Sequence, residues 1–180
     1  RYGLSIVTRV TLPAALEVTM SEQIDVAEKI DVVGIGNALV DVLAHSNDTQ
    51  IESLGMIKGA MNLIDGERAA ELYSILDDRI VVPGGSAANT IIGISSLGGT
   101  AGYVGRVAED DLGDAFADEM AKLDIAYNVP RAPASDPTGR CIVFVTPDGE
   151  RTLNTFLGAS NGLTPADVDH NVIASGSIVF

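Results

Sequence analysis

The sequence is poor in cysteine, tryptophan and basic residues. Cys141 is the one cysteine among 180 residues, so no disulfide can form within the chain. A single thiol fits a reducing compartment, and we expect the protein in the cytoplasm. Tryptophan is absent and aromatic residues make up 4%, which disfavours a β-sandwich with an aromatic core. The hydrophobic share of 46% and the 19 glycines instead favour an α/β protein with many tight turns.

Basic residues are outnumbered by acidic ones, 11 to 25, which gives a formal net charge of −14. The electrostatic field of such a negative charge repels nucleic-acid phosphates and anionic membrane surfaces, so we expect neither a nucleic acid nor a membrane as a partner. No apolar run reaches the roughly 18 residues that a membrane-spanning helix needs. A negative chain still binds a nucleotide where backbone N–H groups and one or two cations act locally.

The first residues differ in character from the rest. The chain begins with Arg1, and Met20 precedes a polar segment, which makes Met20 a candidate for the natural start. The stretch before it has no continuous apolar core and places Arg9 among its apolar residues, so it makes a poor signal peptide. We expect residues 1–29 to be an extension, disordered or introduced by cloning, in front of a domain over residues 30–180.

Short apolar segments alternate with helical patterns in that domain. Strands are predicted over residues 30–35, 80–82, 101–107, 125–129 and 177–180. Helices are predicted over residues 48–54, 66–76, 86–97, 111–123 and 164–174. In the second of these, the apolar residues that form one face end at residue 76. The alternation of the two patterns predicts a parallel α/β sheet.

Two regions, residues 39–64 and 127–157, do not fit this alternation. They contain extended segments without crossover helices, and PDGE at residues 147–150 is a strong hairpin signal. We expect these regions to form a small antiparallel sheet that projects from the main layer. The chain then ends inside the apolar strand at residues 177–180, whose edge would expose unpaired backbone groups, and we therefore expect a fragment of a larger domain.

The first candidate site is the segment GNALVD, residues 36–41, directly after a buried strand. Ligands of open α/β sheets gather at the carboxyl ends of strands. Asp41 could accept hydrogen bonds from two neighbouring hydroxyls, with Asn37 beside it as donor and acceptor. The alternative is a solvated loop aspartate with a turn-forming Asn37. A dinucleotide fingerprint is disfavoured, because Leu39 stands where the third glycine of G-x-G-x-x-G belongs.

The second candidate is Gly84-Gly85-Ser86, at a turn from a strand into a helix. Two glycines let a ligand approach the backbone, and the free N–H groups of the helix start can donate to a hydroxyl or an anion. Asn89, one turn into the helix, could point to the same place. The alternative is a turn that only packs the helix tightly on the sheet.

The third candidate is Arg151, directly after the hairpin turn. An arginine on a lid could stabilise a phosphoryl group during its transfer. The alternative is a solvated charge paired with Glu150 or Asp148. His45 and His170 have no partners at metal-ligand spacing, so we expect no metal ligand in the chain.

Taken in order, these segments resemble the PfkB family of carbohydrate and nucleoside kinases. The resemblance runs from about residue 30 to 180 and rests on GNALVD, PGGSAANT, YVGRVAEDDLGDAF, and TGRC with PDGERTL. It implies the ribokinase-like fold, a doubly wound α/β domain with a small β-sheet lid, here truncated on its C-terminal side. The G-N-x-x-x-D form, and Cys141 after T-G-x, are closer to the adenosine kinase branch.

The resemblance also implies a function for these residues. It implies an ATP- and Mg²⁺-dependent kinase that phosphorylates a primary hydroxyl of a nucleoside, adenosine-like, or of a sugar. Asp41 would bind vicinal hydroxyls of the acceptor with Asn37 beside it, and Arg151 would approach the transferred phosphate. The remaining acceptor-binding positions would be Gly84, Gly85, Ser86, Asn89 and Cys141. A homodimer formed through the lid is an arrangement that the family allows.

One motif of the family is absent. The catalytic base of these kinases is an aspartate in a G-A-G-D segment, whose glycine-rich helix start forms an anion hole, and no such segment occurs here. The chain therefore resembles the first half of a family member, with most of the ATP and Mg²⁺ sites outside it. We expect a kinase when the protein is full-length and no activity from the 180 residues alone. The alternative is a non-catalytic binding or assembly module.

Overall fold

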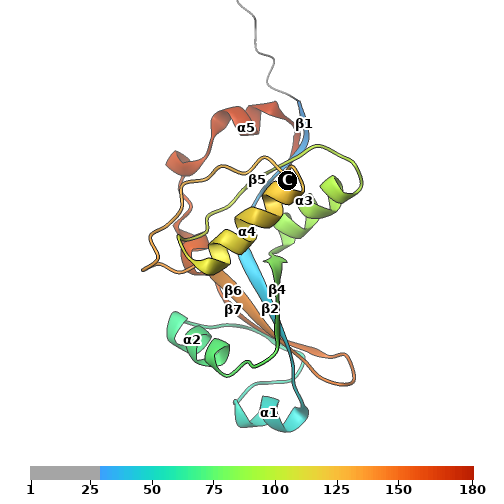
Figure 1. The fold of residues 1–180 in the computed structure, drawn as a ribbon, viewed down its shortest axis with the longest axis vertical. Helices are drawn as coiled ribbons and strands as arrows, with labels where there is room; N and C mark the ends of the chain where they lie inside the picture. The colour runs from blue at the N-terminus through green and yellow to red at the C-terminus, as the bar shows by residue number, and fades with distance from the viewer. Residues whose placement is uncertain (1–28) are drawn as a thin grey trace, which may run out of the picture.

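A computed structural model describes residues 29–180, which form two sheets toward opposite ends of an elongated molecule (Figure 1). The extension predicted for residues 1–29, and the start predicted at Met20, lie outside the described residues apart from Lys29. The predicted α/β class and the second sheet that projects from a parallel layer are confirmed. The prediction that this second sheet is the smaller one is wrong for these residues, because it has five strands and the parallel layer has three.

The main layer is a parallel sheet of three strands. β1 (Ile30–Ile35) lies between β5 (Ala101–Val104) and β8 (Gly176–Val179), and both neighbours run parallel to it. The apolar helix α3 (Ser86–Ser96) packs against β1 and β5, while α5 (His170–Ser175) packs against β8 and β1. The helices therefore bury β5 and the middle of β1, whereas most of β8 stays exposed.

An aromatic cluster joins this layer to α4 (Asp111–Lys122). The rings of Tyr103, Phe116 and Tyr127 have centroids 5.6–6.0 Å apart. Two of these side chains also hold loops: the Tyr103 hydroxyl donates to the Gly36 carbonyl and the Tyr127 hydroxyl donates to the Gly105 carbonyl, both at 3.0 Å. The cluster thereby fixes the loop that leads from β1 toward Asp41.

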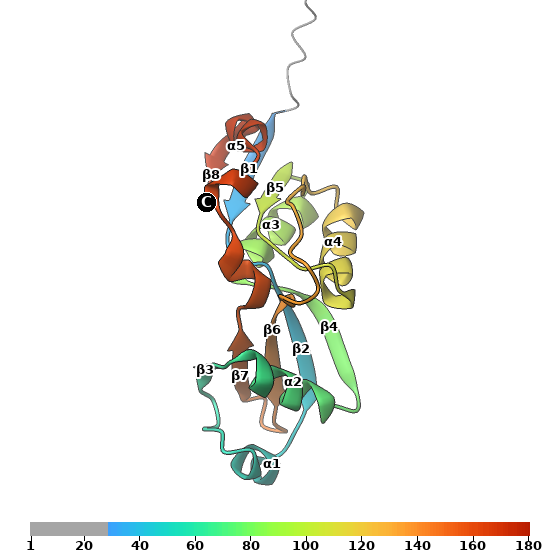
Figure 2. The same cartoon turned by 90° about the vertical axis from the view of Figure 1, so that its left-hand side faces the viewer.

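The second sheet, which we call the lid sheet, has five strands in the order β3-β7-β6-β2-β4 (Figure 2). They are β2 (Leu39–His45), β3 (Met61–Leu63), β4 (Arg79–Gly84), β6 (Gly139–Val145) and β7 (Arg151–Phe156). The short helices α1 (Asp48–Ser53) and α2 (Gly66–Ser74) belong to the same end of the molecule, and α2 packs against β6 and β7.

The two faces of the lid sheet differ in burial. Val40, Val42, Ile142 and Phe144 are fully buried on the face that carries the lid core. Residues alternate between faces along a strand, so Asp41 lies on the opposite face. That face carries several exposed apolar side chains: Met61, Leu63, Ile80 and Val82.

The lid sheet is mixed, which corrects the prediction of an antiparallel sheet. β2 and β6 run parallel because both enter the sheet from the main layer, whereas β4 and β7 run antiparallel to them on the way back. The strand predicted at residues 80–82 is the edge strand β4 of this sheet. Residues 126 and 132 form isolated bridges to residues 102 and 108 of the main layer, so the strand predicted over 125–129 is wrong.

Two predicted helices also differ from the structure. The helix predicted over residues 164–174 is replaced by the 3₁₀ turn η2 (Pro165–Asp167) and by α5, after another 3₁₀ turn, η1 (Gly158–Gly162). Asp167 accepts from the N–H and hydroxyl of Thr164, and Asp169 accepts from the Asn171 N–H to start α5, each at 2.8 Å. The helix predicted over residues 48–54 would take Asp48 as its cap, but in α1 the cap is Asn47, whose side-chain oxygen accepts from the Gln50 N–H at 2.9 Å.

Across residues 29–180, every helix is too short or too polar to cross a membrane.

Candidate functional site

Asp41 occupies the centre of a row of side chains that crosses the lid sheet. It is paired in register with Val82 on β4 and Cys141 on β6, and Cys141 is paired with Thr155 on β7. The carboxylate is half-buried, and this burial raises its pKa, while the positive charge of Arg151 acts in the opposite direction. No hydrogen bond from residues 29–180 reaches the carboxylate, so its oxygens stay available to a ligand.

Gly84 lies directly against this carboxylate. A Cβ atom added to Gly84 would lie 2.7 Å from Asp41 Oδ2 and closer still to Cγ and Oδ1. The structure therefore brings together the first and second segments singled out in the sequence, which are far apart along the chain.

Gly85 begins α3 in a conformation that favours glycine. Its φ is +94°, and an added Cβ atom would lie 2.5 Å from the carbonyl oxygen of Asn37. No side chain caps α3, so the first N–H groups of the helix, from Ser86 onward, have no side-chain acceptor. Asn37 and Ser86 are both exposed beside this turn.

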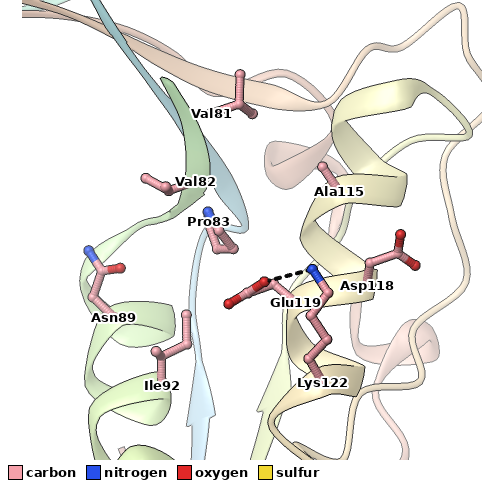
Figure 3. Close-up of a pocket in the computed structure, with 9 residues that line it drawn as sticks. All are labelled: Val81, Val82, Pro83, Asn89, Ile92, Ala115, Asp118, Glu119 and Lys122. Carbon is pink, nitrogen blue, oxygen red and sulfur yellow. Dashed lines mark hydrogen bonds and ion pairs between the residues drawn. The ribbon is translucent and has the colours of Figure 1, made fainter. Parts of the chain in front are cut away.

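Asn89 lies beside a groove that it shares with Val82, the residue paired in register with Asp41. Its side chain lines a groove of about 460 Å³ between β4, α3 and α4, with Pro83, Ile92 and Lys122 among its neighbours and Asp41 outside the lining (Figure 3). Lys122 pairs with Glu119 across one turn of α4, with Nζ and Oε2 3.1 Å apart. An acceptor-binding role for Asn89 stays a prediction.

Cys141 and Arg151 lie on the hairpin strands β6 and β7, on the same face of the lid sheet as Asp41. The Cys141 thiol is buried and accepts a hydrogen bond from Thr155 Oγ1 at 3.3 Å, and burial raises its pKa. A thiol of this kind stays protonated at neutral pH and serves as a small apolar contact. Arg151 is the exposed first residue of β7, and its positive charge partly opposes the rise that burial causes in the pKa of Asp41.

Sequence reasoning missed two features of this site. Thr155 bonds to Cys141, and the exposed apolar side chains lie on the same face as Asp41. Alternation along residues 151–156 places Arg151 and Thr155 on one face, but the register across the hairpin is needed to show that Thr155 lies in the row of Asp41 and that Arg151 lies four residues further along the strands.

His45 and His170 are exposed, as expected of surface residues. Among residues 29–180, no three His, Cys, Asp or Glu side chains gather closely enough to hold a metal ion.

Comparison with known proteins shows the family to which this chain belongs. The model of the pfkB family carbohydrate kinases matches residues 61–179. Adenosine kinase from Sinorhizobium meliloti is 44% identical, with a TM-score of 0.78 over 84% of this chain and 46% of that structure. The chain belongs to the pfkB family, and its fold is the ribokinase-like α/β fold of the adenosine kinases.

Relatives with other acceptors are also similar. Fructokinase from Klebsiella pneumoniae is 32% identical over 62% of this chain and 36% of its own length. Guanosine-inosine kinase from Escherichia coli K12 is 28% identical over 81% of this chain and 35% of its own length. The chain therefore spans less than half the length of these relatives.

Proposed function

We propose that the protein is an ATP-dependent kinase that phosphorylates a primary hydroxyl of a nucleoside, adenosine-like, or of a sugar. In this proposal, the chain supplies the residues that bind and orient the acceptor. It does not supply the base that removes the hydroxyl proton, and residues 1–180 alone are inactive. Membership of the pfkB family and the likeness to adenosine kinase support the reaction type.

The state of Asp41 is the observation that carries this proposal. A carboxylate that is half-buried, in the field of an arginine, and free of hydrogen bonds from residues 29–180 is costly to keep without a ligand. Two neighbouring hydroxyls of an acceptor could donate to its two oxygens and replace the lost water. The uncapped N–H groups at the start of α3 lie beside it and could donate to a third polar group.

The apolar surroundings of Asp41 favour a nucleoside over a free sugar. A sugar presents hydroxyls on most of its carbons, and each needs a polar partner when it is buried. The face around Asp41 instead offers Val82, Ile80 and Leu63, all with exposed apolar side chains. Such a surface suits the flat face of a heterocyclic base attached to a ribose diol.

Arg151 is proposed to act on the phosphoryl group as a mobile cation on the rim of the lid sheet. It is exposed on β7, and its charge reaches Asp41. A planar guanidinium matches phosphate oxygens with two parallel N–H donors. ATP and Mg²⁺ would supply the transferred group and its charge neutralisation, but residues 29–180 gather no acidic cluster for Mg²⁺, so we assign none of them to it.

The test is an assay of the gene's full-length product with ATP and a panel of adenosine, guanosine, inosine, ribose and fructose. We expect phosphorylation of a nucleoside. Asp41→Ala should raise the KM for the acceptor about ten- to a hundredfold, since hydrogen bonds to a charged group contribute roughly 1.5–3 kcal/mol. Glu52→Ala is the matched control, because Glu52 is an exposed carboxylate on α1. ATP consumption with none of these acceptors would exclude the proposed reaction.

One observation favours a second candidate, a non-catalytic assembly module. Ile178 and Val179 are exposed on β8, an edge strand of the main layer, as is Phe180 directly after it, and such an edge can pair with another polypeptide. A full-length product that binds partners but never consumes ATP would favour the module over the kinase.

A further inference from the structure

In the lid sheet, the Asp41 carboxylate occupies the space that a side chain at Gly84 would fill. All three carboxyl atoms of Asp41 lie within 2.7 Å of the point where a Cβ atom of Gly84 would be. Real Cβ atoms do not approach other atoms so closely, so an alanine at this position would have to displace the carboxylate or separate β2 from β4.

The register of the two strands explains the contact. Asp41 is directly opposite Val82, and Gly84 lies two residues further along β4 on the same face, opposite Leu39. Diagonal neighbours of this kind are within reach of a side chain that leans along the sheet. The Asp41 carboxylate therefore leans over the bare Cα of Gly84, toward Gly85 and the start of α3.

The opposite direction offers the carboxylate no comparable space. Ile80 lies two residues from Val82 on the other side, with an apolar side chain that would meet a carboxylate leaning that way. No hydrogen bond from residues 29–180 fixes the carboxylate either. The space left by Gly84 is therefore the main structural feature that sets the direction of Asp41.

Backbone strain does not account for a glycine at position 84. Gly85 has a φ of +94°, but Gly84 is absent from the residues with positive φ, and it lies within the strand β4. An L-amino acid can adopt such a backbone without penalty. Glycine is thus required at the two positions for different reasons. Position 85 needs it for the backbone conformation, and position 84 needs it to leave room for the Asp41 side chain.

We propose that Gly84 is a positioning residue of the acceptor site. Because Gly84 has no side chain, the Asp41 carboxylate can occupy the space beside it and point toward the start of α3. The inference deepens the proposed function and rests on it for the role of Asp41. Any side chain at position 84 turns the carboxylate away from α3, so the acceptor loses its diol contact although Asp41 itself is unchanged.

The relation between the two residues is tested first without a ligand, in the 180-residue chain. We compare thermal unfolding of the wild type, Gly84→Ala, Asp41→Ala and the double variant. Gly84→Ala should lower Tm when Asp41 is present and should leave Tm unchanged or raised in the Asp41→Ala background, where the obstacle is gone. Gly93→Ala is the control, since a Cβ atom there meets nothing within 4 Å.

The comparison of these four variants still tests the inference if Gly84→Ala does not fold. The double variant must then fold, because it removes the atoms with which the new Cβ atom collides. An equal loss of Tm in both backgrounds, or a double variant that also fails to fold, would overturn the inference. An NMR titration of Asp41 adds a local readout: its pKa should fall toward the usual carboxyl value in Gly84→Ala, as the displaced carboxylate gains water, and should not change in Gly93→Ala.

The functional consequence is measured in the full-length product with the acceptor that it phosphorylates. Gly84→Ala should raise the acceptor KM at least tenfold, and it should add nothing to the effect of Asp41→Ala. Additive effects on KM would overturn the inference. If no acceptor is phosphorylated but the Tm cycle behaves as expected, the proposed function fails while the relation between Gly84 and Asp41 stands.

Discussion

The two sheets of the molecule use their faces in different ways. The main layer is a parallel sheet that α3 and α5 cover, and its strand β5 is buried along its whole length. The lid sheet is mixed, with one face in the core and the other open around Asp41. Covering by helices makes the main layer a scaffold, whereas the half-covered lid sheet has a surface left for a ligand.

Within the lid sheet, this division falls between successive residues of one strand. Val40 and Val42 on β2 are fully buried, while Asp41 between them carries a half-buried carboxylate to the other face. If Asp41 binds the acceptor as we propose, residues for stability and residues for binding alternate along the same strand. Substitutions on the two faces should separate the two properties.

The largest expected effect comes from the covered face. Ile142→Ala on β6 should destabilise the chain by about 2–5 kcal/mol, because it empties a fully buried site in the lid core. Ile80→Ala on β4 is the matched control on the open face, where the side chain is 64% exposed, and it should cost less than about 0.5 kcal/mol. Urea unfolding followed by circular dichroism measures both. Similar losses for the two variants would mean that the faces are not distinct.

A smaller effect, of opposite sign, is expected from Asp41. Burial raises the folded-state pKa of this carboxyl above its unfolded value, so ionisation at neutral pH costs stability. Asp41→Asn removes that cost and should raise Tm at pH 7. The gain should shrink as the pH falls through the raised pKa, and it should vanish below the unfolded pKa of about 3.9, where the wild type is protonated in both states. Thermal unfolding of both chains from pH 3 to 8 measures the gap, and a gap that widens on acidification would contradict the expected sign.

The alternation of patterns was sufficient to predict the α/β class and the projecting sheet, because each buried strand carries its own apolar signature. The places of Asp41, Gly84 and Gly85 directly after or at the end of predicted strands were also sufficient to single them out as separate candidates. The alternation could not place Asp41 against Gly84, since that contact depends on the register between β2 and β4.

Other misses have the same origin in tertiary structure. The parallel pairing of β2 with β6 depends on both entering the lid sheet from the main layer, which no local pattern encodes. Which groove Asn89 lines likewise depends on how α3 packs on the sheet, and its role in acceptor binding stays a prediction. The sequence indicated that Asn89 lies one turn into the helix. It did not indicate which residues lie next to its side chain.

The smallest expected effect lies at the outer end of the lid sheet, where charges rather than burial hold the loops. Lys58 Nζ lies 2.7 Å from Asp48 Oδ1 on α1 and 2.6 Å from Asp148 Oδ2 in the hairpin turn. These bonds raise the pKa of Lys58 to about 12, and the bond from Lys58 is the main cause that lowers the pKa of Asp148. Because the partners are exposed, the contribution should be screened by salt.

Lys58→Met should therefore lower Tm by less than Ile142→Ala does, and more at low ionic strength than at high. The linkage has a definite direction: the lowered pKa of Asp148 contributes stability above its unfolded value, and this contribution is lost as the pH falls through the folded pKa. The difference in Tm between the wild type and Lys58→Met should accordingly narrow in acid. Lys122→Met, which breaks one exposed pair within α4, is the control and should change Tm less. A loss that is independent of salt would show that Lys58 acts through the packing of its stem, and the outer end of the lid sheet would then resemble the covered face after all.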